Sequence, residues 1–286
     1  MKNSFSVDID CDPIWVYERD LNINFRIKKN LIFIQALNVY LKLLKKYKLK
    51  ATFFVIAKDL KIKDNVIFFK KAIIEGHQIG NHTFNHYSNF SKKNLKVVNN
   101  EIYKAHDFIK KKLKITPKGF RAPSYNINPY TDNILSRLNY KYDSSHLPGF
   151  STFLYKIFFL INKKKKSFSV IKNFFSKNKF QILNNLNLYR FPIATSTFFR
   201  FPIHPSVVYF LGKKYFNFFM KNLSNTSGHH VLLFHAADLF NADQNHDKFK
   251  YFFNKSYDFR FKLIEMYFKK IKNKVIFKED LIKTNN

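Results

Sequence analysis

Strand-like and helix-like segments alternate along most of this chain, and this alternation restricts the fold more than any other feature. Residues 51–57 form a continuous apolar run typical of a buried strand, whereas residues 94–113 carry apolar side chains at helical spacing. Repeated strand–helix units favour a mainly parallel sheet or barrel. The expected strands are residues 5–10, 51–57, 78–81, 119–122, 140–144, 188–193, 231–234 and 274–277, and the expected helices are 31–47, 66–75, 94–113, 129–138, 205–223 and 257–271.

Size and composition fit a globular protein with a proper core. The chain has 286 residues, of which 46% are hydrophobic, so it suits one large α/β domain or two small ones. Cys11 is the only cysteine, which excludes an intramolecular disulfide and a cysteine-based zinc site. The N-terminus lacks an apolar core of signal-peptide length, and no apolar stretch is long enough for a membrane span. We therefore expect a cytoplasmic protein.

The formal net charge of +32 has two interpretations. Such an excess of positive charge is typical of proteins that bind nucleic acid or an anionic membrane. However, lysine greatly outnumbers arginine, and asparagine, isoleucine, phenylalanine and tyrosine are all frequent, which is typical of an AT-rich genome. Lysine then fills ordinary solvated surface. Composition alone leaves both interpretations open.

One segment, at about residues 151–180, interrupts the alternation. It mixes bulky apolar residues with lysines, including the run Lys163–Lys166, and contains almost no acidic residue. We expect an insertion that packs on the domain with its lysines in water. The alternative is a segment that lies at an anionic membrane surface, with phenylalanine inward and lysine towards the headgroups, at the inner face of the membrane.

Two histidines, His82 and His86, follow a short apolar run and lie four residues apart. On a helix or in a tight helical loop, this spacing lets both imidazoles face one ion. Imidazole suits zinc and its first-row neighbours. The pair therefore predicts a metal site that needs a carboxylate from elsewhere in the chain.

The carboxylate is expected near the N-terminus, where Asp8, Asp10 and Asp12 follow one another at the end of a predicted strand. Side chains two residues apart on a strand face the same side, so Asp8 and Asp10 should lie together. Like charges this close ionise more easily when a cation is present. One carboxylate can then bind a metal while another acts as a base. Taken alone, the same three residues could simply cap a loop.

A series of short motifs in a fixed order resembles the polysaccharide deacetylase family, which is carbohydrate esterase family four with the chitooligosaccharide-deacetylase homology domain. The resemblance covers residues ~5–280. It implies a distorted (β/α) barrel of about seven parallel strands, so that residues 1–286 form one catalytic domain with an insertion at about 151–180. The motifs are Asp8-Ile9-Asp10, residues 51–55, His82-Thr83-Phe84-Asn85-His86, Arg121-Ala122-Pro123-Ser124-Tyr125, residues 142–145 and residues 232–235.

The resemblance also implies the roles of individual residues. Asp10, His82 and His86 match the metal-binding triad, and Asp8 matches the catalytic base, which Arg121 would hold in place. The spacing in this chain differs from the common family form, in which two aspartates are adjacent and precede glycine. Which of Asp8, Asp10 and Asp12 binds the metal therefore stays open.

The second half of the implied site supplies acid catalysis and substrate contacts. His235 resembles the general acid, and Asp143 resembles the residue that orients it. Ser124 falls where a backbone N–H helps to bind the oxyanion. Trp15 and Tyr125 could stack on a sugar ring or could pack at the barrel mouth. The remaining histidines, among them His77, His204, His229, His230 and His246, are expected to be structural or to lie at the surface.

The sequence thus predicts a metal-dependent hydrolase that removes an N-acyl group, acetyl or formyl, from an amino sugar. Zn²⁺ is the expected cofactor, with Co²⁺, Ni²⁺ or Mn²⁺ as alternatives. The expected partner is an amino-sugar-containing glycan or a lipid-linked sugar precursor, with contact to an anionic membrane but no nucleic acid. Two alternatives remain: a basic, non-catalytic protein that binds membrane or polyanions, and a hydrolase of a non-sugar amide.

Overall fold

The computed structural model describes residues 3–22, 24, 29–149, 180–196, 200–241 and 255–285. Its centre is an eight-stranded sheet in the order β6-β7-β5-β4-β3-β2-β1-β8. All neighbouring strands are parallel except β6, which pairs antiparallel with β7. The strands are β1 (Ser4–Cys11), β2 (Thr52–Val55), β3 (Gln78–Asn81), β4 (Gly119–Phe120), β5 (Tyr142–Asp143), β6 (Gln181–Leu183), β7 (Leu188–Arg190) and β8 (His229–His235).

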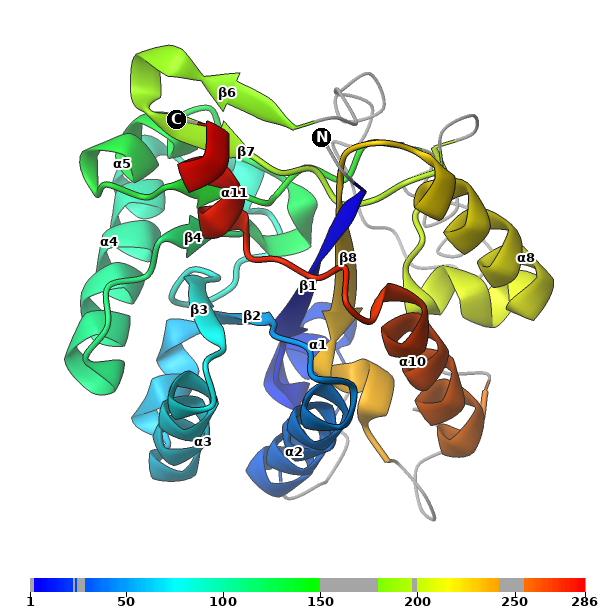
Figure 1. Cartoon of the computed structure of the whole chain (residues 1–286). Helices are drawn as coiled ribbons and strands as arrows, with labels where there is room; N and C mark the ends of the chain where they lie inside the picture. The colour runs from blue at the N-terminus through cyan, green and yellow to red at the C-terminus, as the bar shows by residue number, and fades with distance from the viewer. Residues whose placement is uncertain are drawn as a thin grey trace.

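The sheet curls until its two ends approach each other. A parallel bridge joins Ile193, just beyond β7, to Val231 in β8, and the N–H of Ala194 donates to the carbonyl of Val231 at 2.9 Å. The helices lie on the outside of the curled sheet (Figure 1). The expectation of a distorted (β/α) barrel with about seven parallel strands is confirmed. The helices are α1 (Ile14–Leu21), α2 (Lys29–Tyr47), α3 (Lys63–Ile74), α4 (Leu95–Leu113), α5 (Thr131–Arg137), α8 (Pro205–Asn225), α10 (Tyr257–Ile271) and α11 (Lys278–Asn285).

The C-terminal region differs from the sequence-based expectation. The strand expected at residues 274–277 is only a single parallel bridge between Val275 and Phe5. The chain then forms α11, whose first residue, Lys278, is fully buried. Helix α1 and strand β6 were also not expected, because they are only eight and three residues long.

Burial explains why the sheet forms around β1. All eight residues of this strand are buried, which is typical of a parallel strand covered on both faces. On the helical side, Phe53 of β2 packs edge-on against Phe68 and Phe69 of α3, with ring centroids 6.0 and 6.4 Å apart. Such aromatic pairs add about 0.5–1.5 kcal/mol each beyond simple burial. This packing fixes the strand ends that carry the polar residues.

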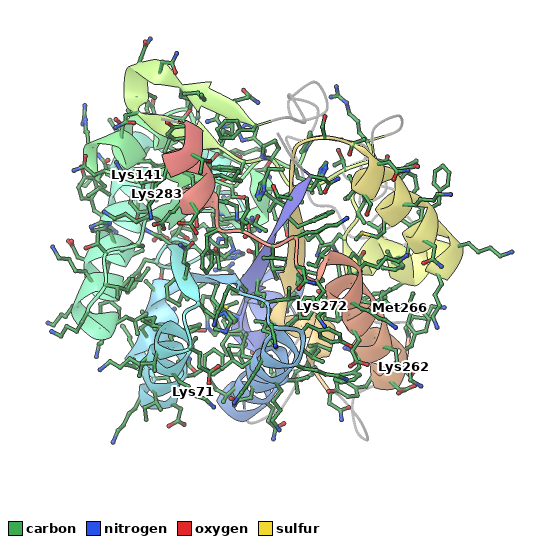
Figure 2. The ribbon with its side chains drawn as sticks, viewed as in Figure 1. Lys71, Lys141, Lys262, Met266, Lys272 and Lys283 are labelled. Carbon is green, nitrogen blue, oxygen red and sulfur yellow. The ribbon has the colours of Figure 1, made fainter. Side chains whose placement is uncertain are left out.

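Much of the positive charge lies at the outer surface. The side chains of Lys71, Lys262 and Lys283 are 59%, 61% and 76% exposed, and each pairs with a nearby carboxylate. Figure 2 labels all three at the periphery of the ribbon. This arrangement fits the interpretation that lysine fills solvated surface. The basic segment at about 151–180 lies outside the described residues except for Phe180. No helix within the described ranges has the length and apolar character to cross a bilayer.

Candidate active site

Polar side chains gather where the parallel strands end. Asp10 lies near the end of β1, His82 directly follows β3, Arg121 follows β4 and His235 ends β8. The carboxyl ends of parallel strands meet at one edge of a sheet or barrel, where ligands usually bind. The structure therefore brings together residues that lie up to 225 positions apart in the sequence.

Asp12, His82 and His86 form one of two groups of described residues with the geometry of a metal site; the other is His204, His235 and Asp238. Oδ1 of Asp12 lies 3.5 Å from Nε2 of His82 and 3.6 Å from Nε2 of His86. Two ligands at ~2.1 Å from one tetrahedral zinc would lie about 3.4 Å apart. Among the described residues, Oδ1 of Asp12, the oxygen that faces both imidazoles, is buried without a hydrogen-bond partner. The donor set therefore fits a zinc ion.

The third member of this group is not the residue expected from the family pattern. In the turn after β1, a carboxylate oxygen of Asp12 lies within 4.8 Å of a ring nitrogen of each of the two histidines. Asp10 instead points to Arg121 and His235. The reason is how far along β1 each aspartate lies. Asp10 is still part of the strand, and only the residue beyond its end reaches the loop that carries the histidines.

This histidine loop is held by its neighbours. It is not helical, and the His82 and His86 rings lie 4.7 Å apart. Nδ1–H of His82 donates to the carbonyl of Arg121 at 2.8 Å, which leaves Nε2 as the metal-facing atom. The hydroxyl of Thr83 accepts from the N–H of His86 and so helps to fix the loop.

Glu101, on α4, completes the support of the loop, and sequence reasoning did not identify it. Its buried carboxylate accepts from the backbone N–H groups of Phe84 and Asn85 and from the side-chain amide of Asn85. A buried carboxylate with three donors is well satisfied. No local signal in the sequence could show this, because the partners are sixteen and seventeen residues away on another element.

Two of the three groups, His86 and Asp12, are in the deprotonated form that a metal ion requires. Burial lowers the pKa of His86 to about 3, so its imidazole is neutral at physiological pH. Burial opposes ionisation of Asp12, but the two adjacent imidazoles outweigh it and lower its pKa. Burial also opposes protonation of His82, yet the hydrogen bond with Asp12 and the charge of Asp10 raise its pKa. A divalent ion would displace that proton.

Arg121 connects the two aspartates of β1. Its Nη1 donates to Oδ1 of Asp10 at 3.0 Å, its Nη2 donates to Asp8, and its Nε donates to the carbonyl of Ser144 at 2.8 Å. The guanidinium also lies over the ring of Phe54, 4.5 Å from its centroid. Both aspartates thus share one side of the strand, as the period of two requires.

Asp8 lies behind Arg121 and not in the open part of the site. Its carboxylate is fully buried and accepts from Arg121 and from Lys278, which enters from α11 between the rings of Phe54 and Tyr142. Burial lowers the pKa of Lys278 to about 8 despite the attraction of Asp8. The geometry therefore does not support the expected role of Asp8 as catalytic base.

Asp10 has the position that a base requires. Its Oδ1 is held by Arg121, and its Oδ2 lies 3.9 Å from Nε2 of His235. Burial raises the pKa of Asp10, although the charge of Arg121 partly opposes this shift. A carboxyl group with a raised pKa accepts a proton more readily than one in water.

Among the described residues, the ring nitrogens of His235 lie within hydrogen-bond distance of two side chains, neither of which is Asp143. Its Nδ1 lies 2.7 Å from Nε2 of His204, and its Nε2 lies 2.7 Å from the hydroxyl of Tyr125. Asp143, at the end of β5, instead accepts from Ser145 and from Arg190, which lies on the adjacent strand β7. The orienting role expected for Asp143 therefore lacks geometric support.

The histidines expected at the surface also differ from prediction. His204 is only 9% exposed because it lies inside the site, and His229 and His230 begin β8 with intermediate exposure. His77, expected to be structural, is buried and accepts from the N–H of Ala51. His246 lies outside the described residues.

The remaining predicted contacts lie around the site. The indole N–H of Trp15 donates to Oδ1 of Asp59 at 2.7 Å, and Lys58 lies over the indole ring. Burial raises the pKa of Asp59 to about 7. Ser124 and Tyr125 have left-handed backbone conformations, with φ of 53° and 57°. Such strained backbone in a non-glycine residue is more common at functional sites than elsewhere.

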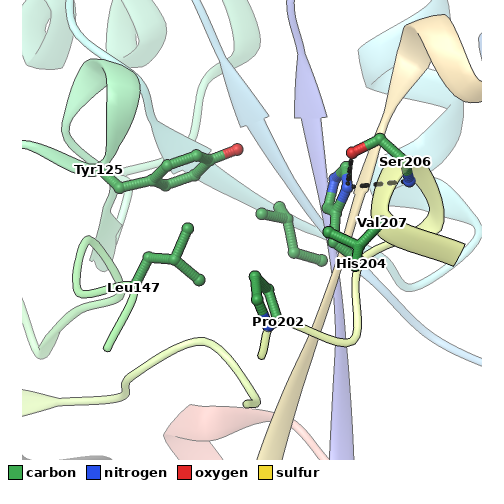
Figure 3. Close-up of a pocket in the computed structure, with 7 residues that line it drawn as sticks. Tyr125, Leu147, Pro202, His204, Ser206 and Val207 are labelled. Carbon is green, nitrogen blue, oxygen red and sulfur yellow. Dashed lines mark hydrogen bonds between the residues drawn. The ribbon is translucent and has the colours of Figure 1, made fainter. Parts of the chain in front are cut away.

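A small cavity lies beside Tyr125 and His204, the two side chains that contact the His235 ring (Figure 3). Its volume is about 20 Å³, enough for roughly one group the size of a water molecule or a methyl. Tyr125 and His204 contribute polar atoms at its edge, and the other lining is mainly apolar. The lining residues are Tyr125, Leu147, Pro202, His204, Ser206, Val207 and Leu233.

Comparison with known proteins finds relatives for part of the chain. Residues 35–142 match the family model for polysaccharide deacetylase. A peptidoglycan-N-acetylglucosamine deacetylase of Bacillus cereus is 41% identical over 90 residues, which cover 31% of this chain and 39% of that protein. Protein YlxY of Bacillus subtilis, which is uncharacterised, is 34% identical over 90 residues, covering 32% of this chain and 27% of that protein. The chain thus aligns with well under half the length of these relatives.

Solved structures show the same fold over almost the whole chain. A Mycobacterium smegmatis protein provisionally described as a polysaccharide deacetylase superposes with a TM-score of 0.63 at 13% identity, covering 99% of this chain and 91% of that one. Puue allantoinase gives 0.57 at 10% identity, with 98% and 88% covered. The family-model match over residues 35–142, the partial sequence matches and this fold together support the resemblance to the polysaccharide deacetylase family.

Proposed function

We propose that this protein is a metal-dependent hydrolase that removes an N-acyl group, acetyl or formyl, from an amino sugar. One observation carries the proposal. Asp12, His82 and His86 present three ligand atoms at the separation of zinc ligands, beside a carboxylate, Asp10, that Arg121 holds in place. The partial identity to a peptidoglycan-N-acetylglucosamine deacetylase supports an amino-sugar substrate.

In this proposal, Asp12, His82 and His86 hold Zn²⁺, with Co²⁺, Ni²⁺ or Mn²⁺ as alternatives. When bound, the ion supplies Lewis-acid activation of the amide carbonyl and of water. Asp10 accepts the proton of the attacking water, since Arg121 fixes its other oxygen. His235 lies 3.9 Å from Asp10, where its Nε2–H can donate a hydrogen bond to the leaving nitrogen, and the proton that Asp10 took from water passes to that nitrogen as the C–N bond breaks. The Ser124 N–H, at a strained turn beside the site, is the proposed donor to the oxyanion.

The small cavity supports a short acyl group. The space of about 20 Å³ beside Tyr125 and His204, the ring partners of His235, is of the size of a methyl group. Trp15 and Tyr125 are proposed to contact the sugar. The further proposal is a glycan or lipid-linked sugar precursor at the cytoplasmic face of a membrane. The excess positive charge supports it, since phosphate-bearing carriers and anionic lipids are attracted to such a surface.

Release of acetate and formate from defined amino sugars tests the proposal. The purified chain is incubated with zinc and with N-acetyl- and N-formyl-glucosamine oligosaccharides, and the acids and new amines are quantified. Activity should require zinc and should disappear in Asp10→Asn, whereas a matched substitution of a distant surface carboxylate, Asp258→Asn, should leave it unchanged. Equal product in Asp10→Asn and the unmodified chain would contradict the catalytic assignment.

A further inference from the structure

His204 occupies the position beside His235 where a carboxylate was expected, and its own environment fixes its proton. It is the N-cap of α8, and its Nδ1 accepts from the backbone N–H of Ser206 at 3.2 Å. The hydroxyl of Ser206 lies 2.6 Å from the same nitrogen. Figure 3 shows both contacts as dashed lines. A backbone N–H can only donate, so Nδ1 of His204 must carry the lone pair.

The proton of a neutral His204 must then be on Nε2. Burial, together with the charges of His235 and Arg121, keeps the pKa of His204 well below its ordinary value, so the ring is neutral. Its Nε2 lies 2.7 Å from Nδ1 of His235. Since Nε2 of His204 donates, Nδ1 of His235 must accept. A neutral His235 therefore has its proton on Nε2, where it donates to the hydroxyl oxygen of Tyr125 at 2.7 Å.

We propose that His204 is a positioning residue that locks His235 in the Nε2–H tautomer. The hydrogen bonds run in one direction, from the Ser206 amide through His204 and His235 to Tyr125. A carboxylate at the same place would do the opposite, because it would draw the proton of His235 to Nδ1 and leave a lone pair on Nε2. The inference rests on the proposed function only in assigning His235 to the reaction. The tautomer itself follows from the hydrogen bonds.

Among side chains, the other groups around His235 do not set its Nδ1 proton. Asp10 and Tyr125 face its Nε2, and Asp238 accepts from its backbone N–H at 2.8 Å. The backbone N–H of Asp238 also donates to the His235 side chain, which agrees with a ring nitrogen that carries a lone pair on that side. Within the described residues, His204 is the side chain that contacts Nδ1 of His235. Residue 204 is therefore the side chain whose identity should decide whether this tautomer is kept.

Long-range ¹H–¹⁵N NMR of the ¹⁵N-histidine-labelled, metal-free protein at neutral pH tests the proposal without any assay of activity. The His235 signals are assigned by their loss in His235→Gln. In the unmodified chain, Nδ1 of His235 should have the shift of an unprotonated nitrogen and Nε2 that of an N–H. A protonated Nδ1 in this spectrum would overturn the proposal even if every variant failed to fold.

Two variants of equal size provide the matched comparison. His204→Gln can still donate at the position of Nε2 and should keep the tautomer, whereas His204→Glu offers an ionised acceptor and should move the His235 proton to Nδ1. His106→Gln is the control, because His106 is a buried histidine on α4 that contacts the hydroxyl of Tyr140. The same His235 tautomer in both His204 variants would overturn the proposal.

Kinetics separate this inference from the proposed function. On an active substrate, His204→Glu should lower kcat by roughly 10²-fold or more with little change in KM, and His204→Gln should recover most of the rate. If no amino sugar is hydrolysed but the NMR result holds, the proposed function fails and the tautomer assignment stands. If Glu and Gln lower kcat equally, the positioning role fails.

Discussion

Replacement of Asp12 tests which carboxylate belongs to the proposed metal site. Its Oδ1 is 3.5 and 3.6 Å from the two imidazole nitrogens, whereas Oδ1 of Asp10 is held at 3.0 Å by Arg121. Asp12→Asn should therefore remove a zinc ligand, and Asp10→Asn should not. The two substitutions change the same number of atoms and the same charge, so each is a control for the other.

The expected magnitude follows from ligand loss. Removing a residue that only orients a ligand weakens metal binding about 10–100-fold, so the loss of one of three ligands should weaken it at least ~100-fold. Zinc at 1,000 times Kd stabilises the folded state by about 4.1 kcal/mol, and at 10 times Kd by only ~1.4 kcal/mol. At this protein size, the difference corresponds to roughly 5–10 °C less zinc-induced rise in Tm.

Differential scanning calorimetry with and without zinc measures this effect, and isothermal titration gives Kd directly. Asp12→Asn should lose most of the zinc-dependent rise in Tm, while Asp10→Asn keeps it and loses turnover. The opposite pattern, with zinc stabilisation lost in Asp10→Asn and kept in Asp12→Asn, would refute the geometric assignment and restore the family-based one.

Three further results are expected. His235→Gln should keep zinc affinity and lower kcat about 10²–10⁴-fold, measured by acyl release and by titration. Burial raises the pKa of Asp59 to about 7, so the wild-type protein loses stability as pH rises from ~4 to ~7. In urea unfolding of the metal-free protein, the unfolding free energy of Asp59→Asn relative to wild type should therefore increase by up to ~4 kcal/mol across that window. A difference between the two proteins that does not change with pH would contradict this prediction. Arg121→Lys should cost about 3–5 kcal/mol of unfolding free energy, because one ammonium group cannot pair with both Asp8 and Asp10; a smaller loss would show that the two aspartates find other partners.

The fold could be predicted from the sequence because its signals are local. Apolar runs and helical spacing lie within single segments, so the alternation of strands and helices was visible without any tertiary contact. The same holds for His82, His86, Arg121 and His235, which follow predicted strands, and parallel strands bring their carboxyl ends to one edge. Short elements such as β6 and α1 were missed because three to eight residues carry too little periodicity.

The roles of the aspartates could not be read from spacing. A period of two places Asp8 and Asp10 on one side of β1, and Arg121 contacts both. It does not say how far along the strand the metal site lies. Because the histidine loop is level with the turn after β1, Asp12 reaches it, Asp10 lies beside His235, and Asp8 lies deeper with Lys278.

The sequence by itself determined the strand–helix order, the barrel class and the histidine pair, since each is written in residues close together. Only the tertiary structure decided that Asp12 joins that pair, that Glu101 holds its loop, that Lys278 neutralises Asp8 and that His204 contacts His235. These partners are separated by 16 to 270 positions. Their proximity depends on how the sheet curls and where α8 and α11 pack against it, which no local pattern encodes.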